Sequence, residues 1–242
     1  MRLWALVLVM ASAVLPLACG EQERPTPIPT AEVVHQIPWG EREEAIYRAL
    51  RGDSVVGRGV ISLQREGRVL IISQDFTDAR GRFRDVVKAS VDAVTLRPQV
   101  VERVLTGPEG ERRWRAQYED GRVRVFQESD GDTRTDELVV PPVSYDSWSD
   151  IALWRTMPLA YGFRATYMGV GTAILRKPAT AVITVEVVSK ETVIVPAGTF
   201  QAWRVQVLSG DEVQTVWMAD LPQRPVVRYD NGTYVFELEE LR

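Results

Sequence analysis

Asp146 and Asp150 are the two side chains whose spacing comes closest to acid–base chemistry. They stand four residues apart at the start of an expected helix, so they would lie on one face of it. Two carboxyl groups held together can divide the roles of general acid and general base, as they do in glycosidases. Acidic residues in a first helical turn also accept hydrogen bonds from free N–H groups and complement the helix dipole. We favour this structural interpretation, because no further catalytic group accompanies the two acids.

The other reactive side chains form no catalytic set. His35 is the only histidine and Cys19 the only cysteine, and both precede the expected folded domain. A Ser-His-Asp or Cys-His arrangement therefore has no histidine or thiol inside that domain, and a zinc site lacks its usual ligands. The sequence predicts a protein that is not an enzyme and that holds neither a metal nor another cofactor.

The stretch SDGDTRTDE has the alternating acids of a calcium-binding loop, but it departs from that pattern in one place. Asp130, Asp132 and Asp136 could supply oxygen ligands, whereas Arg134 occupies a position where a further oxygen belongs. An arginine there opposes a divalent cation, so we interpret the stretch as an acidic, solvated loop.

Cys19 lies between an apolar N-terminus and a proline-rich run, and this position favours lipidation. Residues 1–18 have one positive residue, a mostly apolar stretch and a final group of small residues, which is the layout of a signal peptide. Leu17, Ala18 and Cys19 resemble the cleavage site of lipoprotein signal peptides, with Pro16 in place of the usual leucine. The resemblance implies a protein that begins at an acylated Cys19, outside the cytoplasm and attached to a bacterial membrane.

Two alternatives to this anchor remain open. Cleavage after Ala13 would give a soluble secreted protein, and an uncleaved N-terminus would itself hold the chain at the membrane. Residues 19–36 follow the cysteine, with Pro25, Pro27 and Pro29 on alternate positions. Such a run favours an extended, semi-rigid spacer, and we therefore expect a tether over residues 19–36.

The composition describes a globular domain after the tether. The chain of 242 residues is 45% hydrophobic and 26% charged, with a net charge of −4, which is enough apolar content for a core. Nucleic-acid binding needs a basic face, whereas here basic and acidic residues are interleaved and the balance is acidic. We expect no nucleic-acid partner.

From Ile37 to Arg242 the hydrophobic period is mostly two, which predicts a meander of antiparallel strands. Hairpin turns are expected at Gly67, Asp120-Gly121, Gly210-Asp211 and Asn231-Gly232. Asp-Gly and Asn-Gly suit the type I′ turn, because both of its central residues have positive φ. Arginines alternate with apolar residues inside several of these strands, so one face of the sheet should be wet.

A single segment, SYDSWSDIALWRTMPLAYG, breaks this period. Ser144, Asp146 or Ser147 can cap a helix there, and the helix should end near Met157 because Pro158 disfavours helical geometry in the residue before it. Apolar residues cover most of the circumference of this helix, so we expect it to be buried inside or across the curved sheet.

The chain resembles a family of bacterial periplasmic and lipoprotein β domains of unknown function that carry a VPAGTF hairpin. The matching pieces occur in the expected order and cover nearly everything from Trp39 to the C-terminus; they are WGEREEAIYRA, VDAVTLRP, SWSDIALWRTMPL, VPAGTFQAWRV and VWMADLPQRPVVRY. These domains are similar in shape to the LolA and LolB lipoprotein carriers. The resemblance implies a strongly curved antiparallel sheet, a half-barrel, that clasps one central helix. In the Lol carriers the concave face holds acyl chains, whereas the VPAGTF relatives imply no activity.

Two functions follow from this fold. In the first, sheet and helix enclose an apolar groove that binds a lipid or another hydrophobic ligand near the membrane. The expected lining of that groove is Trp148, Ile151, Trp154, Met157, Trp203 and Trp217. In the second, the same side chains fill the interior, and the protein is an envelope interaction module that docks a partner through its outer face.

Overall fold

The computed structural model describes residues 33–129, 131–173 and 177–242. The predicted signal peptide, Cys19, most of the predicted tether and Asp130 of the acidic loop lie outside the described residues. Within them, no helix is long and apolar enough to cross a membrane.

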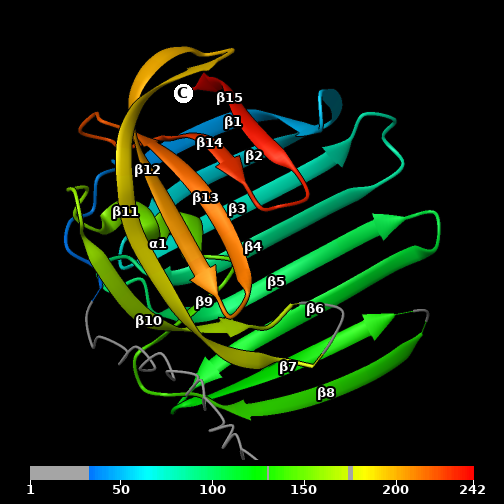
Figure 1. The fold of residues 1–242 in the computed structure, drawn as a ribbon. Coiled ribbons are helices and arrows are strands. Elements are labelled where there is room, and N and C mark those ends of the chain that lie inside the picture. Colours follow the sequence, from blue (N-terminus) through cyan, green and yellow to red (C-terminus); the bar gives the residue numbers. More distant parts are fainter. Residues whose placement is uncertain (1–32, 130, 174–176) are drawn as a thin grey trace, which may run out of the picture.

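One curved, unclosed sheet of fifteen strands wraps around a single described helix (Figure 1). Its spatial order is β8-β7-β6-β5-β4-β3-β2-β1-β15-β14-β13-β12-β11-β10-β9, so the chain runs outward from β1 to one edge and returns from the other edge to pair β15 with β1. Each described pair of neighbouring strands is antiparallel except β9 and β10, which are parallel. The predicted fold class, a mainly β half-barrel around one helix, is confirmed.

The elements have the following bounds: β1 Arg42–Arg51, β2 Ser54–Glu66, β3 Val69–Asp78, β4 Arg84–Asp92, β5 Pro98–Gly107, β6 Gly110–Glu119, β7 Arg122–Ser129, β8 Asp132–Val139, β9 Ser144–Asp146, α1 Asp150–Thr156, β10 Arg164–Gly171, β11 Ala179–Val195, β12 Gly198–Ser209, β13 Glu212–Ala219, β14 Val226–Asp230 and β15 Val235–Leu241.

The turns between strands fall where the glycines predict them, with one difference in geometry. Asp120 and Gly121 both have positive φ, 48° and 73°, as a type I′ turn requires. At the next expected I′ turn only Gly232 has positive φ. Asn231 instead accepts hydrogen bonds at Oδ1 from the backbone N–H groups of Thr233 and Tyr234, at 3.0 and 2.8 Å. Side-chain bonding of this kind produces a longer loop than the predicted two-residue turn.

Helix α1 is shorter than predicted, and it begins later. Its N-cap residue is Ser149 rather than Ser144, Asp146 or Ser147, because residues 144–146 form β9 and pair with β10. The C-terminal end agrees with the prediction: Met157, before Pro158, is extended at φ −76° and ψ 155°. All seven helical residues are buried, so the helix fills the interior of the half-barrel as expected.

The chain before β1 packs against the end of this helix. Val33 is buried, and the backbone N–H of Gln36 donates to the carbonyl of Thr156 at 3.1 Å. Arg224 donates to the carbonyls of Arg155 and Met157 at 3.0 and 2.8 Å, and so satisfies the free C-terminal end of the helix. The packed part of the chain therefore includes Val33, ahead of Ile37, where the domain was expected to begin.

Two hydrophobic clusters hold the fold together. The larger one joins the helix to the inner face of the sheet. The smaller one lies where the tip of the β11–β12 hairpin, the VPAGTF segment, folds back against β1, β14 and β15; its buried members are Ala45, Tyr47, Val193, Val195, Ala202, Ala219, Val227 and Leu238. The backbone N–H of Ala197 in this tip donates to the carbonyl of Leu238 at 3.0 Å. The hairpin thus braces the pairing of β14 and β15 with the rest of the sheet.

Candidate functional site

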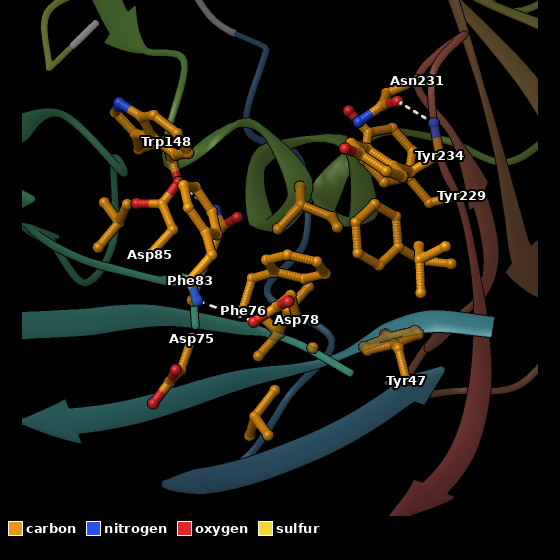
Figure 2. Close-up of a pocket in the computed structure, with 18 of the residues that line it drawn as sticks. Tyr47, Asp75, Phe76, Asp78, Phe83, Asp85, Trp148, Tyr229, Asn231 and Tyr234 are labelled. Carbon is orange, nitrogen blue, oxygen red and sulfur yellow. Dashed lines mark hydrogen bonds between the residues drawn. The ribbon is translucent and has the colours of Figure 1, made fainter. Parts of the chain in front are cut away.

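A cavity of about 710 Å³ lies on the concave side of the sheet, beside the start of the helix (Figure 2). Strands β1 to β4 form one side of it, Trp148 and Ile151 border it from the helical segment, and β14, β15 and their turn close the far side. Its aromatic lining consists of Tyr47, Phe76, Phe83, Trp148, Tyr229, Tyr234 and Phe236. The volume falls within the usual range of small-molecule sites, about 300 to 1,000 Å³.

Three turns lie close together at one rim of the half-barrel, where the strands end, and border this cavity. This rim is the edge at which they meet. The end of β1 pairs with the start of β15 through Leu50 and Val235, which brings the β1–β2 and β14–β15 turns together. The backbone N–H of Ala79 donates to the carbonyl of Val56 at 2.8 Å and joins the β3–β4 turn to the same edge. Residues 51, 82 and 231, one from each of these turns or its flanks, contribute to the cavity wall.

The aromatic side chains of the wall contact one another at their rings. Phe76 lies 6.2 to 6.3 Å from the ring centroids of Phe83, Tyr234 and Phe236, and Tyr229 stacks on Phe236 at 5.9 Å. Such contacts are favourable beyond the burial of apolar area alone. They form a continuous apolar surface along this wall.

Two glycines of β2 lack side chains at the positions where these rings lie, and so leave space for them. A Cβ atom on Gly57 would lie 2.5 Å from the carbonyl oxygen of Thr77 and 2.7 Å from the Phe76 ring. At Gly59 the nearest atom to an added Cβ would be in Phe236, at 3.6 Å, and Gly59 itself borders the cavity. The sheet therefore has a bare stretch of backbone over which the aromatic rings lie.

Each of the three carboxylates in the wall already has a partner. Asp75 accepts hydrogen bonds from Arg84 at 3.0 and 2.5 Å, and Asp85 accepts two from Arg103 at 2.8 and 2.7 Å. Asp78 accepts from backbone N–H groups of the β3–β4 turn, and those bonds lower the pKa of its carboxyl group. Within the described residues, no group of three or more His, Cys, Asp or Glu side chains is arranged to hold a metal ion.

The Asp85–Arg103 pair also fixes the position of Trp148. The guanidinium of Arg103 lies 4.9 Å from the Trp148 ring centroid and 5.2 Å from that of Trp114. Gln74 donates to the backbone carbonyl of Trp148 at 2.8 Å. Because a paired cation and a hydrogen bond both act on Trp148, its ring is a positioned part of the cavity wall rather than a mobile cover.

The family described as "Protein of unknown function (DUF3108)" matches residues 45–239 of this chain, which include the whole cavity wall. The chain belongs to the DUF3108 family. The prediction of a β domain of unknown function is thereby confirmed, while the likeness to the LolA and LolB carriers stays a prediction.

Two solved structures align with this DUF3108 domain, and the first of them resembles it in fold. A β-barrel-like protein of the domain of unknown function DUF1849 from Brucella abortus aligns with a TM-score of 0.53 and 13% identity, over 86% of this chain and 98% of that one. A putative exported protein with a YmcC-like fold from Bacteroides fragilis aligns with a TM-score of 0.33 and 12% identity, over 86% and 99% of the two chains. No curated protein matches significantly. None of these descriptions names an enzymatic activity.

The two acids considered for catalysis are buried away from the cavity of this DUF3108 domain. Asp146 lies in β9 rather than on the helix, and its Oδ2 accepts from Tyr118 at 2.5 Å and Thr172 at 2.6 Å. Asp150 lies close to the hydroxyl of Tyr167, and its buried Oδ1 has no hydrogen-bond partner among the described residues. Burial raises the pKa of Asp146, and it raises that of Asp150 well above its usual range. Neither acid borders the cavity, so this pair belongs to the packed interior and is not placed to act on a molecule bound there.

The six residues expected to line a groove fall into three places. Trp148 and Ile151 border the cavity. Trp154 and Met157 do not, because they point into the packed core, where Trp154 donates through Nε1 to Tyr167 at 3.0 Å. Trp203 also lies outside the wall: it donates to Asp220 at 3.0 Å, and its ring lies 5.1 Å from that of Tyr161.

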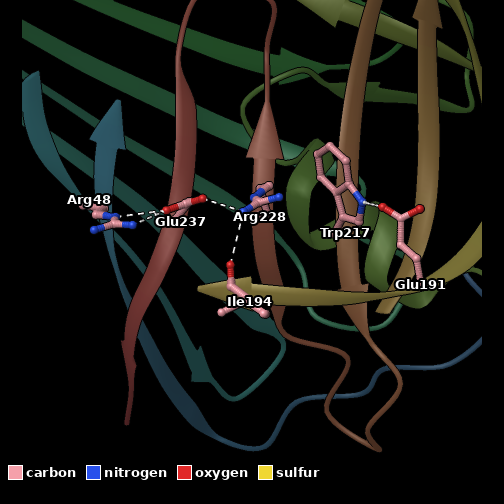
Figure 3. Close-up of polar contacts among 6 residues, drawn as sticks. All are labelled: Arg48, Glu191, Ile194, Trp217, Arg228 and Glu237. Atoms are coloured by element: carbon pink, nitrogen blue, oxygen red, sulfur yellow. Dashed lines mark hydrogen bonds and ion pairs between the residues drawn. The ribbon is translucent and has the colours of Figure 1, made fainter. Parts of the chain in front are cut away.

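Trp217 lies on the opposite face of the sheet from the helix. It alternates with Val216 and Met218, which belong to the main core, and its Nε1 donates to Glu191 of β11 at 2.7 Å. In Figure 3 it stands beside a row of ion pairs in which Glu237 accepts from Arg228 and Arg48, each at 2.6 Å. Trp217 therefore supports the outer side of the sheet beneath β11.

The aromatic wall of β3, β14 and β15 was absent from the sequence prediction, although the sequence carries a signal for it. Tyr229, Tyr234 and Phe236 cluster around the predicted Asn231 turn, and Phe76 and Phe83 flank the β3–β4 turn. Aromatic residues on both sides of two turns that meet at one edge would form such a cluster. What the sequence does not show is that β15 pairs with β1, which brings the two turns together.

Proposed function

We propose that this domain is a non-enzymatic binding protein that holds a lipid or another hydrophobic ligand in the cavity of its concave sheet. The observation that supports this most is the cavity itself, about 710 Å³ with seven aromatic residues in its wall. Sites of this size and lining, with few polar groups, are typical of small apolar ligands. The three acids of the wall are each engaged with arginine or backbone N–H groups, which leaves the apolar surface dominant.

The second part of the proposal concerns location. We propose that the mature chain begins at an acylated Cys19 and stays on the outer side of a bacterial membrane, where a hydrophobic ligand would be available. The signal-peptide layout of residues 1–18 and the single cysteine after it support this. Intact mass spectrometry of the membrane fraction should show a lipid on Cys19, and Cys19→Ala should be released or left unprocessed. An N-terminus at another residue, without lipid, would contradict the anchor.

The binding proposal can be tested by titrating the purified protein with the neutral dye N-phenyl-naphthylamine, whose fluorescence rises in apolar surroundings. Saturable binding is expected. Gly59→Val should weaken it, because the added side chain projects into the cavity, where the first contact of a Cβ would be Phe236 at 3.6 Å.

Gly40→Val is a control for this variant. A Cβ there would have no atom within 4 Å, and Gly40 is not part of the cavity wall. Dye binding should be unchanged in it. If the wild type shows no saturable uptake, the binding proposal is wrong, and an interaction module with a packed interior becomes the better account.

A further inference from the structure

We propose that the ligand carries an anionic group, and that Arg51 and Arg82 hold this group at the turns that border the cavity. The inference rests on the proposed ligand-binding function and adds the chemical class: an amphiphile with an apolar body and one carboxylate or phosphate end. It follows from comparing the polar groups of the cavity wall that are already engaged with those that are free.

Most polar side chains of the wall have partners within the protein. Tyr47 donates to the carbonyl of Val226 at 2.9 Å, and Tyr229 donates to Gln214 at 2.7 Å. Gln74 and Asn231 bond to backbone groups, and Asp75, Asp78 and Asp85 are engaged as described above. These groups orient the wall and need nothing from a ligand.

Two cations of the wall differ from these engaged groups. Arg51 and Arg82 are exposed, and within the described part of the chain neither guanidinium forms a hydrogen bond or an ion pair, although the charge of Arg82 acts on the nearby carboxylate of Asp78. The contrast is clear beside Arg84 and Arg103, whose guanidinium groups bind Asp75 and Asp85 from the same sheet. The wall therefore combines carboxylates that are already paired with guanidinium groups that are available.

Both free arginines stand at the edge where the three turns meet. Arg51 ends β1, and Arg82 lies in the β3–β4 turn, which the Ala79–Val56 hydrogen bond holds against the start of β2. An anion at this edge can contact a guanidinium, which binds carboxylate and phosphate groups through two N–H donors. Behind it, the apolar part of the same molecule would lie on Phe76, Phe83 and their aromatic neighbours. The free cations and the apolar wall thus favour one amphiphilic ligand.

The test measures displacement of N-phenyl-naphthylamine by molecules with the same chain and different ends: dodecanol, dodecanoate and dodecyl phosphate, with inorganic phosphate as a competitor without a chain. The anionic amphiphiles should bind more tightly than dodecanol, by up to about fivefold for each exposed guanidinium. The relative order of dodecanoate and dodecyl phosphate tells which anion fits better. Inorganic phosphate alone should displace nothing.

The double variant Arg51→Gln/Arg82→Gln should lose this preference and bind dodecanol as the wild type does. Arg80→Gln is the matched control, because Arg80 belongs to the same β3–β4 turn but not to the cavity wall. A general effect of net charge would appear in the control as well, and that would overturn the inference.

The outcomes separate the two proposals. If dodecanol and the anions bind with equal affinity in both the wild type and the double variant, the inference of an anionic ligand group is wrong. The proposal of hydrophobic binding would still stand. Displacement by inorganic phosphate as strong as that by dodecyl phosphate would also overturn it. Failure of all the amphiphiles, together with failure of the dye to bind, would instead refute the binding function.

Discussion

Arg155 of α1 and Glu43 of β1 form a buried ion pair with two hydrogen bonds, at 2.7 Å between Nη1 and Oε1 and 2.9 Å between Nη2 and Oε2. The side chains are only 6% and 11% exposed. Arg155 also donates to the carbonyl of Gln223 at 2.6 Å and lies over the ring of Trp39. One side chain thus connects the helix to β1, to the turn before β14 and to the segment that precedes β1.

Glu43→Ala should destabilise the domain by about 3 to 5 kcal/mol, because it leaves the guanidinium of Arg155 buried without its counter-charge. Urea denaturation of the purified protein measures this directly. Glu43→Ala/Arg155→Ala should cost less than the sum of the two single variants, since the double variant leaves no unpaired charge. Additive costs would mean that the ion pair does not couple the helix to the sheet.

The burial of Asp150 should make its contribution to stability depend on pH. A raised pKa in the folded state means that the native protein binds the proton more tightly than the unfolded chain does. The free energy of unfolding therefore falls as pH rises above the unfolded value, about 3.9 for aspartate. Asp150→Asn removes this titration, so its stability relative to wild type should improve between about pH 4 and neutrality.

Thermal unfolding of Asp150→Asn and wild type across this pH range checks the prediction. Asp78→Asn is the opposite control, because turn N–H groups lower the pKa of Asp78 in the folded state. The contribution of Asp78 to the free energy of unfolding is therefore present above its pKa in the unfolded chain, and it is lost as the pH falls through its lower pKa in the folded protein. Parallel pH profiles for Asp150→Asn and wild type would show that the buried carboxyl does not carry the predicted shift.

Gly57 and Gly59 should respond differently to the same substitution. Gly57→Ala should cost about 1 to 3 kcal/mol, because its Cβ would lie 2.5 Å from the carbonyl oxygen of Thr77, a backbone atom that cannot rotate away. Gly59→Ala meets nothing closer than 3.6 Å and should be neutral or slightly stabilising, since alanine is the better strand residue. Urea midpoints of the two variants give the comparison, and equal midpoints would contradict it.

The fold could be predicted from local signals because each hairpin is local. Asp120-Gly121 and Gly210 mark turns whose flanking strands pair at once, so alternation and glycine together indicate the meander. The helix start was wrong for the opposite reason. Residues 144–146 pair in parallel with β10, about twenty residues further on, and no local pattern in Ser144 or Asp146 reveals such a partner.

For the residues expected to line a groove, hydrophobicity alone does not tell which face of the sheet each one occupies, whereas the register of the hairpin does. Pairing outward from the Gly210 turn places Trp203 opposite Met218 and Trp217 opposite Arg204. Successive residues of a strand face opposite sides of the sheet, so Trp217 lies on the other side from Met218 and Trp203. The two tryptophans therefore cannot line one groove, and this register can be derived from the sequence by counting from the Gly210 turn. The burial of Trp154 beneath Tyr167 depends instead on how the helix lies across the sheet, which the sequence pattern does not specify.

Trp148 and Trp154 provide the test that separates a ligand site from a packed core. Trp154 is 4% exposed and donates to Tyr167, so Trp154→Ala should cost about 3 to 5 kcal/mol and also leave the Tyr167 hydroxyl without that donor. Because Trp154 does not border the cavity, affinity for N-phenyl-naphthylamine should change little under conditions where the variant is still folded.

Trp148→Ala should show the reverse pattern. Its ring forms part of the cavity wall and is only half-buried, so its removal should weaken dye binding several-fold and cost less stability than Trp154→Ala. A urea curve and a dye titration on both variants decide the matter, with far-UV circular dichroism to confirm that each is folded. If both substitutions reduced stability and binding in the same proportion, the dye would be reporting the general integrity of the core. Affinity lost with Trp148 alone would locate the ligand against the wall that Trp148 shares with Phe76 and Tyr229.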